Sequence, residues 1–212
     1  MSTSTRTDTR HRAGYHHGDL QHALVTVALE QVRERGGDAV SLRQVAAAVG
    51  VSPSAAYTHF PNKTALLVAV AHAGMDLLDE RMTRAVSLPG DDDATAIARF
   101  RATGEAYVGF GLAEPHLFRH MFGPICAHDD KDLAHIESES VAFNTVGATL
   151  DALDARGLLR AGVREGLDLA AWTMMHGFTS LALDGFLPLE VGPLLIDVLA
   201  RLALADHAQQ LR

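Results

Sequence analysis

Between residues 41 and 64, the chain concentrates side chains that can bond to a phosphate backbone or to the edges of nucleic-acid bases. They are Ser41, Arg43, Ser52, Ser54, Ala55, Ala56, Tyr57, His59, Lys63 and Thr64. Hydroxyl, imidazole and ammonium groups donate hydrogen bonds to phosphate oxygens, serine can bond to either kind of base, and alanine can contact a thymine methyl. These residue types therefore favour contact with double-stranded DNA.

A second group of reactive side chains lies further along the chain and allows two other interpretations. His116 and His120 are four residues apart, so they would share one helix face, and Cys126 and His128 follow after a turn. Such nitrogen and sulfur ligands could hold a transition metal, although no established finger spacing is present. A Cys126 nucleophile beside His128 would suggest an enzyme, but no orienting acid or oxyanion-hole motif accompanies the pair. We expect no catalysis and no cofactor, and a metal-responsive protein remains the alternative.

Two short helices joined by a tight turn would position the DNA-facing residues. Ser41 can cap the first helix together with a glutamine three residues later, and Gly50 can end it. Ser52 followed by proline is typical of a second helix start, because serine accepts free backbone N–H groups and proline has none. The spacing predicts a helix-turn-helix over about residues 41–60.

Residues 15–80 resemble the DNA-binding domain of TetR-family transcriptional regulators. The matching positions are Leu42, Val45, Ala46, Gly50, Val51, Ser52, Tyr57, His59, Phe60 and Lys63. The segment YHHGDL before them is similar to the entry to the first helix in one subgroup, whose C-terminal domain carries tryptophan, histidine and glycine on one helix. Trp172, His176 and Gly177 fit that pattern.

The resemblance implies an all-α fold. An N-terminal three-helix DNA-binding domain with the helix-turn-helix would precede a C-terminal helical domain for ligand binding and dimerisation. It also implies a ligand-responsive regulator, more often a repressor, that binds an inverted-repeat operator as a homodimer. A small hydrophobic or aromatic effector would release it from the DNA.

Individual roles in the DNA-binding domain also follow from the resemblance. The positions that usually touch the DNA backbone are Tyr57, His59 and Lys63. The positions where the second helix should enter the major groove are Ser54, Ala55 and Ala56. Arg43 is either a guanine contact or a solvated arginine, and Ser41 and Thr64 have hydroxyls near helix N-termini, where phosphates are favoured. Thr58 stands where related sequences often have a basic residue.

The charge distribution is uneven along the chain. The 212 residues carry a net charge of −8, but residues 1–65 alone carry +2 and the remainder −10. DNA contact depends on the local potential rather than on the total. An acidic body disfavours a third alternative, a non-specific DNA-organising protein, because such binding depends on many phosphate contacts.

Composition limits the class and location of the protein. At 48% hydrophobic residues, the chain can bury the cores of one small and one larger domain. A lone cysteine suits the reducing cytoplasm, and no apolar run approaches the 20 or so residues that a membrane span requires. The polar N-terminus shows no signal peptide. We therefore expect a cytoplasmic protein with no membrane partner.

The chain divides into three predicted parts: a flexible basic arm over residues 1–14, a DNA-binding domain over 15–78, and a C-terminal domain over 79–212. Side chains that could follow a minor groove from the arm are Arg10, Arg12, Tyr15, His16 and His17, although a disordered tail is equally compatible. Helix 1 would begin at a cap on Asp19. Later helices are expected over 63–86, 92–112, 115–122, 130–156, 166–184 and 191–209.

Two further sites are predicted in the C-terminal domain. Aromatic and apolar side chains that could line an effector pocket are Phe110, Phe118, Met121, Phe122, Phe143, Trp172, Met175 and His176. Ordinary core packing is the alternative for each of them. The last two helices carry broad apolar stripes, which predict a four-helix dimer interface through Met174, Phe178, Leu181, Leu195, Val198, Leu199 and Leu202.

Overall fold

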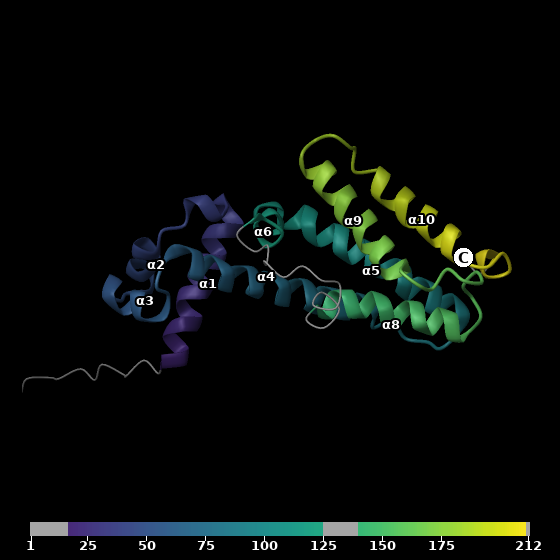
Figure 1. The fold of residues 1–212 in the computed structure, drawn as a ribbon, viewed down its shortest axis with the longest axis horizontal. Coiled ribbons are helices and arrows are strands. Elements are labelled where there is room, and N and C mark those ends of the chain that lie inside the picture. The colour runs from purple at the N-terminus through teal and green to yellow at the C-terminus, as the bar shows by residue number, and fades with distance from the viewer. Residues whose placement is uncertain (1–16, 125–139, 211–212) are drawn as a thin grey trace, which may run out of the picture.

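The computed structural model describes residues 17–124 and 140–210, and within these ranges the protein is built from helices with no β-sheet. Figure 1 shows a small head at one end, a larger helical body at the other, and one long helix, α4, running between them. Leu159 and Leu204 form an isolated antiparallel bridge. The prediction of an all-α fold is confirmed.

Three helices and the start of α4 make the head. They are α1 (His17–Arg35), α2 (Leu42–Val49) and α3 (Pro53–His59), with a short 3-10 turn, η1 (Gly37–Ala39), after α1. Their apolar faces meet in one core, where Leu24, Val45 and Leu66 are fully buried. Asp19 does not cap α1, because the helix already begins at His17. It lies instead in the first turn, where a carboxylate interacts favourably with the helix dipole.

The turn between α2 and α3 follows from the local sequence. Gly50 ends α2 in a left-handed conformation with φ of 82°, which glycine adopts without steric cost. Ser52 caps α3, since its Oγ accepts a hydrogen bond from the Ala55 N–H at 3.2 Å. The predicted capping box at Ser41 does not form, because its side chain makes no cap hydrogen bond. The start of α2 is held by the backbone instead, where the Val45 N–H donates to the Ser41 carbonyl.

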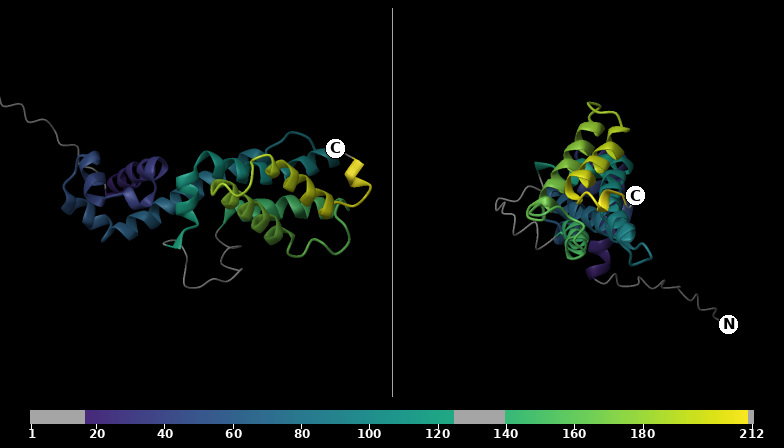
Figure 2. Two further views of the ribbon diagram at one scale, coloured as in Figure 1. Left: turned by 90° about the horizontal axis from the view of Figure 1, so that it is seen from above. Right: turned by 90° about the vertical axis from the view of Figure 1, so that its right-hand side faces the viewer.

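The long helix α4 (Lys63–Val86) belongs to both halves of the molecule. Asn62 caps it by accepting a hydrogen bond from the Ala65 N–H at 2.8 Å. Its 24 residues span about 36 Å at 1.5 Å per residue. It packs against α1 in the head and against α5, α6 and α8 in the body. The two further views in Figure 2 show how this helix gives the molecule its elongated form.

In the described part of the chain, five helices complete the body. They are α5 (Asp93–Ala113), α6 (Pro115–Met121), α8 (Val141–Ala155), α9 (Leu167–Leu183) and α10 (Val191–Ala203). α5 is central, since α4, α6, α8, α9 and α10 all pack against it. Ser140 caps α8 through its side chain. The earlier part of the helix predicted over 130–156 lies outside the described residues.

The predicted helix over 191–209 is wrong after residue 203. α10 ends at Ala203 and the chain becomes extended at Leu204. There the backbone pairs with the segment after α8: the Ala205 N–H donates to the Leu158 carbonyl at 2.8 Å, and the Arg160 N–H donates to the Ala203 carbonyl at 2.9 Å. These bonds replace helical ones, and only a short turn, η3 (Ala208–Gln210), follows.

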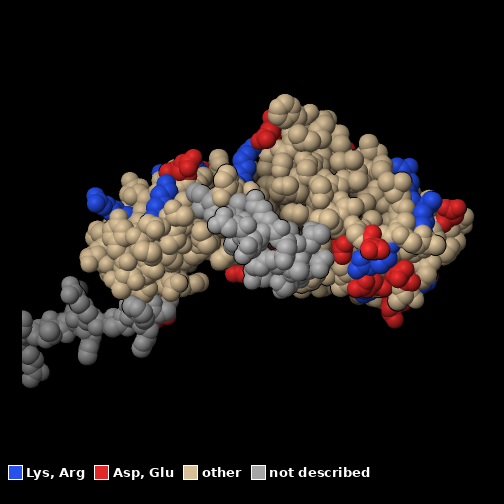
Figure 3. All heavy atoms as spheres, viewed as in Figure 1, with Lys and Arg blue, Asp and Glu red and all other residues tan. Residues whose placement is uncertain are grey.

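Charged side chains gather at different ends of the molecule. On the face shown in Figure 3, lysine and arginine project from the head beside acidic side chains, and a denser group of acidic residues and arginine lies at the far end of the body. The far-end cluster includes Arg156, which forms ion pairs with Asp91 and Asp93. Among the described helices, none is long and apolar enough to cross a membrane.

Candidate nucleic-acid interface and sensor site

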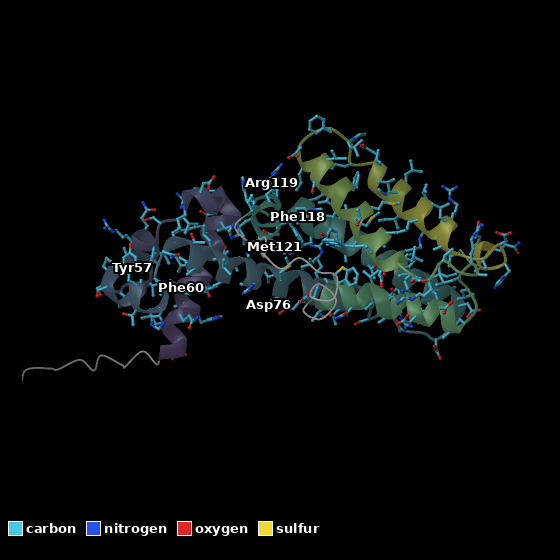
Figure 4. All side chains as sticks on the ribbon, viewed as in Figure 1. Tyr57, Phe60, Asp76, Phe118, Arg119 and Met121 are labelled. Atoms are coloured by element: carbon cyan, nitrogen blue, oxygen red, sulfur yellow. The ribbon has the colours of Figure 1, made fainter. Side chains whose placement is uncertain are left out.

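The helix α3 presents a small polar face to solvent. Ser54, Tyr57 and Thr58 are exposed, and 44% of the Tyr57 surface is accessible. Figure 4 shows Tyr57 and Phe60 close together at the end of the head. Phe60 is buried in the head core and anchors the end of α3. The face that remains open carries hydroxyl groups from two successive turns, as a helix entering a groove would require.

One predicted base contact is wrong. Ala56 is 0% exposed and lies in the core of the head, so its methyl group cannot reach a thymine. Ser54, Ala55 and Ala56 are consecutive small residues, and the sequence alone does not show which of them faces inward. Ala55 is half-buried and packs at the edge of the core, which leaves Ser54 as the most accessible of the three.

Several predicted phosphate contacts are already used within the head. The Lys63 ammonium donates to the Asp38 carbonyl at 2.8 Å, so it joins the start of α4 to η1. Ser52 Oγ is the cap of α3. Ser41 and His59 are half-buried, whereas Arg43 and Thr64 are exposed. Of these six residues, only Ser52, Arg43 and Thr64 are exposed, and the Ser52 side chain is already used as the cap.

The arm prediction falls almost wholly outside the described residues. Arg10, Arg12, Tyr15 and His16 precede them, and His17 is the first residue of α1. The same holds for Cys126 and His128 of the metal hypothesis. Of that group, His120 is buried and its Nε2 lies 2.8 Å from the Leu67 carbonyl, so this nitrogen is committed to α4. Over residues 17–124 and 140–210, no three histidine, cysteine or acidic side chains gather as a metal site.

An aromatic cluster occupies the body where α5, α6, α8 and α9 meet. Its members are Tyr107, Phe118, Phe122, Phe143, Trp172 and His176. The Phe118 ring stacks on His176 with centroids 5.2 Å apart, and Phe122 meets the same imidazole edge-on at 4.6 Å. Five predicted pocket residues are therefore brought together. The three half-buried members, Phe122, Trp172 and His176, form the more accessible side.

A buried hydrogen bond lies inside this aromatic cluster. The Tyr107 hydroxyl is 2.9 Å from His176 Nδ1. Burial raises the pKa of Tyr107, and a hydrogen bond from the Trp172 side chain partly opposes that effect. Burial also lowers the pKa of His176, which favours the neutral imidazole. The sequence pattern indicated an aromatic wall but missed this bond, because only the packing of α5 on α9 makes Tyr107 face His176.

The other predicted pocket residues are core residues of the body. Phe110, Met121 and Met175 are each at most 3% exposed. Met121 packs on α4, where a Cβ on Gly74 would lie 2.7 Å from its sulfur. Figure 4 shows Phe118, Arg119 and Met121 together on α6 at the junction of head and body. α6 therefore touches the aromatic cluster with one residue and α4 with another.

Further contacts join α6 and its preceding turn to the head. The Arg33 guanidinium on α1 donates from Nε to Glu114 at 2.8 Å and forms an ion pair with it. His120 lies so close to η1 that a Cβ on Gly37 would be 2.9 Å from its Nδ1. Together with the bond to Leu67, these contacts make a continuous path from the aromatic cluster to the base of the head.

A separate hollow lies at the far end of the body, between the start of α5 and α10. Its volume is about 710 Å³, and its polar lining includes Thr95, Arg101 and Arg201. Arg101 is ion-paired with Asp197 across it. None of the aromatic cluster lines this hollow.

The predicted dimer residues divide into two groups. Phe178 and Leu199 are only 2% and 7% exposed, so they belong to the core of one chain and cannot contact a partner directly. Phe178 packs against Gly192 of α10, which accounts for its burial. Leu181 and Leu202 are exposed, and Met174, Leu195 and Val198 are half-buried. On the same two helices, Leu194 is exposed although it was not assigned to the interface.

Comparison with known proteins gives two family matches. Residues 24–70 match the bacterial regulatory proteins of the tetR family, and residues 100–206 match the tetracyclin repressor-like C-terminal domain. Nucleoid occlusion factor SlmA of Enterobacter sp. (strain 638) is 29% identical over 103 residues, which are 49% of this chain and 50% of that protein. The chain thus spans about half the length of the curated relatives it matches.

Solved structures resemble the whole chain. A protein of unknown function from Rhodococcus sp. RHA1 is 32% identical with a TM-score of 0.73, covering 90% of this chain and 98% of that one. A TetR-family regulator from Marinobacter aquaeolei VT8 is 20% identical with a TM-score of 0.60, covering 87% and 95%. RolR in complex with resorcinol is 15% identical with a TM-score of 0.63, covering 92% and 93%. The two lower identities show a shared fold.

Proposed function

The chain belongs to the TetR family of DNA-binding transcription regulators, and from this premise we propose that it is a repressor released from its operator by a small effector. The observation that carries the proposal is the position of α6, between the aromatic cluster and the base of the head. Members of this family are transcription regulators rather than enzymes. A regulator of chromosomal genes acts in the cytoplasm, where we expect this protein.

The head, over about residues 15–78, would read DNA with the open face of α3. Tyr57 and Ser54 are the accessible groups best placed to meet a phosphate and a base edge, with Arg43 and Thr64 exposed on neighbouring helices. The seven residues of α3 extend only about 10 Å, so one head touches few base pairs. Specificity would therefore need a second head on an adjacent half-site.

We assign the second head to another copy of the chain, joined through α9 and α10 of the body over residues 79–212. Exposed leucines on both helices, Leu181, Leu194 and Leu202, support this assignment because solvated side chains of this kind gain from burial. Gly177 supports it independently. No atom of the described chain lies within 4 Å of where its Cβ would be, although glycine within a helix costs stability. Close approach of a partner helix would account for it.

Effector binding would act through α6. A ligand that binds better to one arrangement of the aromatic cluster shifts the population towards that arrangement. Phe118 stacks on His176, and its neighbours on α6 contact Leu67, Gly74 and η1, so a displacement of α6 must alter how α4 and the head pack. The two heads of the dimer would then lose the separation that the operator requires. Reciprocally, operator DNA would weaken effector binding by the same factor.

Selection of bound sequences from random double-stranded DNA tests the proposal directly. We expect enrichment of an inverted repeat with half-sites about one helical turn apart, roughly 34 Å. Enrichment of a single half-site would contradict the dimer, and the absence of any enriched sequence would refute the regulator itself. Small molecules are then screened for release of the protein from the enriched site.

A further inference from the structure

The hydrogen bond inside the aromatic cluster fixes the tautomer of His176. The Tyr107 hydroxyl has one proton, and His176 Nδ1 at 2.9 Å is positioned to accept it. Within the described residues, Nδ1 is the only acceptor within hydrogen-bond distance of this buried hydroxyl. The hydroxyl therefore donates its proton to Nδ1. A neutral imidazole that accepts at Nδ1 carries its own proton on Nε2.

Within the described part of the chain, this Nε2–H donor has no hydrogen-bond acceptor. Among residues 17–124 and 140–210, the only hydrogen bond of His176 is the one from Tyr107. Its ring lies among Phe118, Phe122 and Trp172, at the more accessible side of the cluster. A donor that is held in one orientation beside aromatic faces would recognise a flat molecule with one acceptor atom.

The surroundings of the aromatic cluster favour an uncharged ligand. The rings that meet within it belong to aromatic side chains and to His176. The nearest cation on α6, Arg119, is engaged elsewhere, since it donates to the Leu183 carbonyl and to Asp184. Burial also lowers the pKa of His176, so the imidazole offers no positive charge. A carboxylate would lose its hydration here without gaining a counter-ion.

Resting on the proposed effector role of the body, we propose that the effector is a neutral aromatic carbonyl compound whose oxygen accepts a hydrogen bond from His176 Nε2. Phe122 and Trp172, which are half-buried at the more accessible side of the aromatic cluster, would bind its flat faces. Tyr107 acts as a positioning residue, because it holds the imidazole in the tautomer that donates from Nε2. This gives a physical role to the tryptophan and histidine of the Trp172, His176 and Gly177 motif.

Three probes of similar size test the assignment: acetophenone, ethylbenzene, which lacks the acceptor, and benzoate, which is charged. Binding is followed by calorimetry and by the fluorescence of Trp172, the single tryptophan of the chain, whose ring is 5.8 Å from His176. Acetophenone should bind about three- to tenfold more tightly than ethylbenzene, the usual gain from one hydrogen bond. Benzoate should bind more weakly than acetophenone.

Variants separate recognition from folding. His176→Phe keeps an aromatic ring but removes the donor, so it should bind ethylbenzene as the wild type does and lose the preference for acetophenone. Tyr107→Phe should reduce that preference and, in ¹⁵N NMR spectra, give His176 a mixture of tautomers, which a merely structural role would not produce. His72→Phe makes the same change at an exposed histidine of α4 and should alter neither result.

Two outcomes with the wild type and His176→Phe would overturn the assignment, and a third concerns Arg201→Ala. One is an acetophenone preference that survives in His176→Phe, and the other is equal binding of all three probes by the wild type. Probe binding that is lost on Arg201→Ala would place the ligand in the far-end hollow instead and would also refute it. Operator selection from random DNA is independent of these measurements. If no operator is enriched although the protein still distinguishes the three probes, the proposed regulator is refuted. If an operator is enriched but the probes bind equally, only the effector assignment is refuted.

Discussion

At the scale of single residues, the Tyr57 hydroxyl is the most testable DNA contact of the head. It is exposed on α3 and makes no hydrogen bond within the described part of the chain. Tyr57→Phe should therefore leave the folded protein as stable as the wild type. Because hydrogen bonds to charged groups contribute about 1.5–3 kcal/mol, operator affinity should fall about tenfold or more. Fluorescence anisotropy with the selected operator measures the change.

The neighbouring Thr58 provides the matched control. Its hydroxyl already donates to the Ser54 carbonyl at 3.1 Å, so it is less available to a phosphate. Thr58→Ala should change operator affinity by less than about twofold. A larger loss in Thr58→Ala than in Tyr57→Phe would reverse the assignment of the phosphate contact.

Single residues also show where sequence reasoning succeeds. Ser52 and Gly50 were predictable because cap and turn geometry depend on the nearest few residues. Ala56 was not, since adjacent alanines differ only in the direction that the completed helix gives them. Similarly, His116 and His120 satisfy a ligand spacing in the sequence. The carbonyl that His120 meets belongs to Leu67, which lies 53 residues away along the chain.

At the scale of elements, nearby residues predict where a helix lies, but a helix end can depend on residues far away along the chain. Apolar periodicity and turn residues predicted α4 and α5 to within about one residue at each end. They failed after Ala203, where α10 stops because its backbone pairs with the segment following α8. Such a pairing joins segments some 45 residues apart, and no local pattern encodes it. The helix-turn-helix was predictable because its cap and its turn depend on local sequence, although its buried face packs on α1.

The contact between α5 and α9 gives a prediction at this scale. A Cβ on Gly111 would lie 2.3 Å from Thr179 Cγ2 and 3.0 Å from the Phe118 ring. Thr179 is fully buried, so it has little room to move. Gly111→Ala should reduce the free energy of unfolding by about 1–3 kcal/mol, as overpacked cores usually do. Chemical denaturation followed by circular dichroism measures the loss.

A second substitution should restore part of this stability. Thr179→Ser removes Cγ2 but keeps the hydroxyl that donates to the Met175 carbonyl. The double variant should therefore be more stable than Gly111→Ala alone, although Thr179→Ser by itself should destabilise the wild type slightly. Additive losses in the double variant would mean that the clash lies elsewhere. Gly177→Ala offers a comparison, because its Cβ meets no atom of the chain within 4 Å.

At the scale of the whole molecule, a single substitution can test dimerisation without unfolding the chain. Leu202 is 62% exposed on α10, so a charge there is solvated in a single chain but would be buried between two. Leu202→Glu should give a folded monomer with a nearly unchanged circular dichroism spectrum. Sedimentation velocity should show the lower mass, and operator affinity should fall by more than about tenfold, since each head then binds alone.

An exposed leucine outside the proposed interface controls for the added charge. Leu88 follows α4 and is 37% exposed. Leu88→Glu should remain dimeric and should retain operator binding. A monomeric Leu88→Glu, or a dimeric Leu202→Glu, would contradict the interface through α9 and α10.

The length of α4 has a mechanical consequence. In the proposed release from DNA, this rod of 24 residues, about 36 Å long, would act as a lever arm with its fulcrum in the body. A tilt of only about 5° at that fulcrum would sweep the far end through roughly 3 Å, close to the rise of one base-pair step along B-DNA. The movement that binding causes in the body could thus be small enough to leave its core packing intact. It would still displace each head along its groove by about one base-pair step.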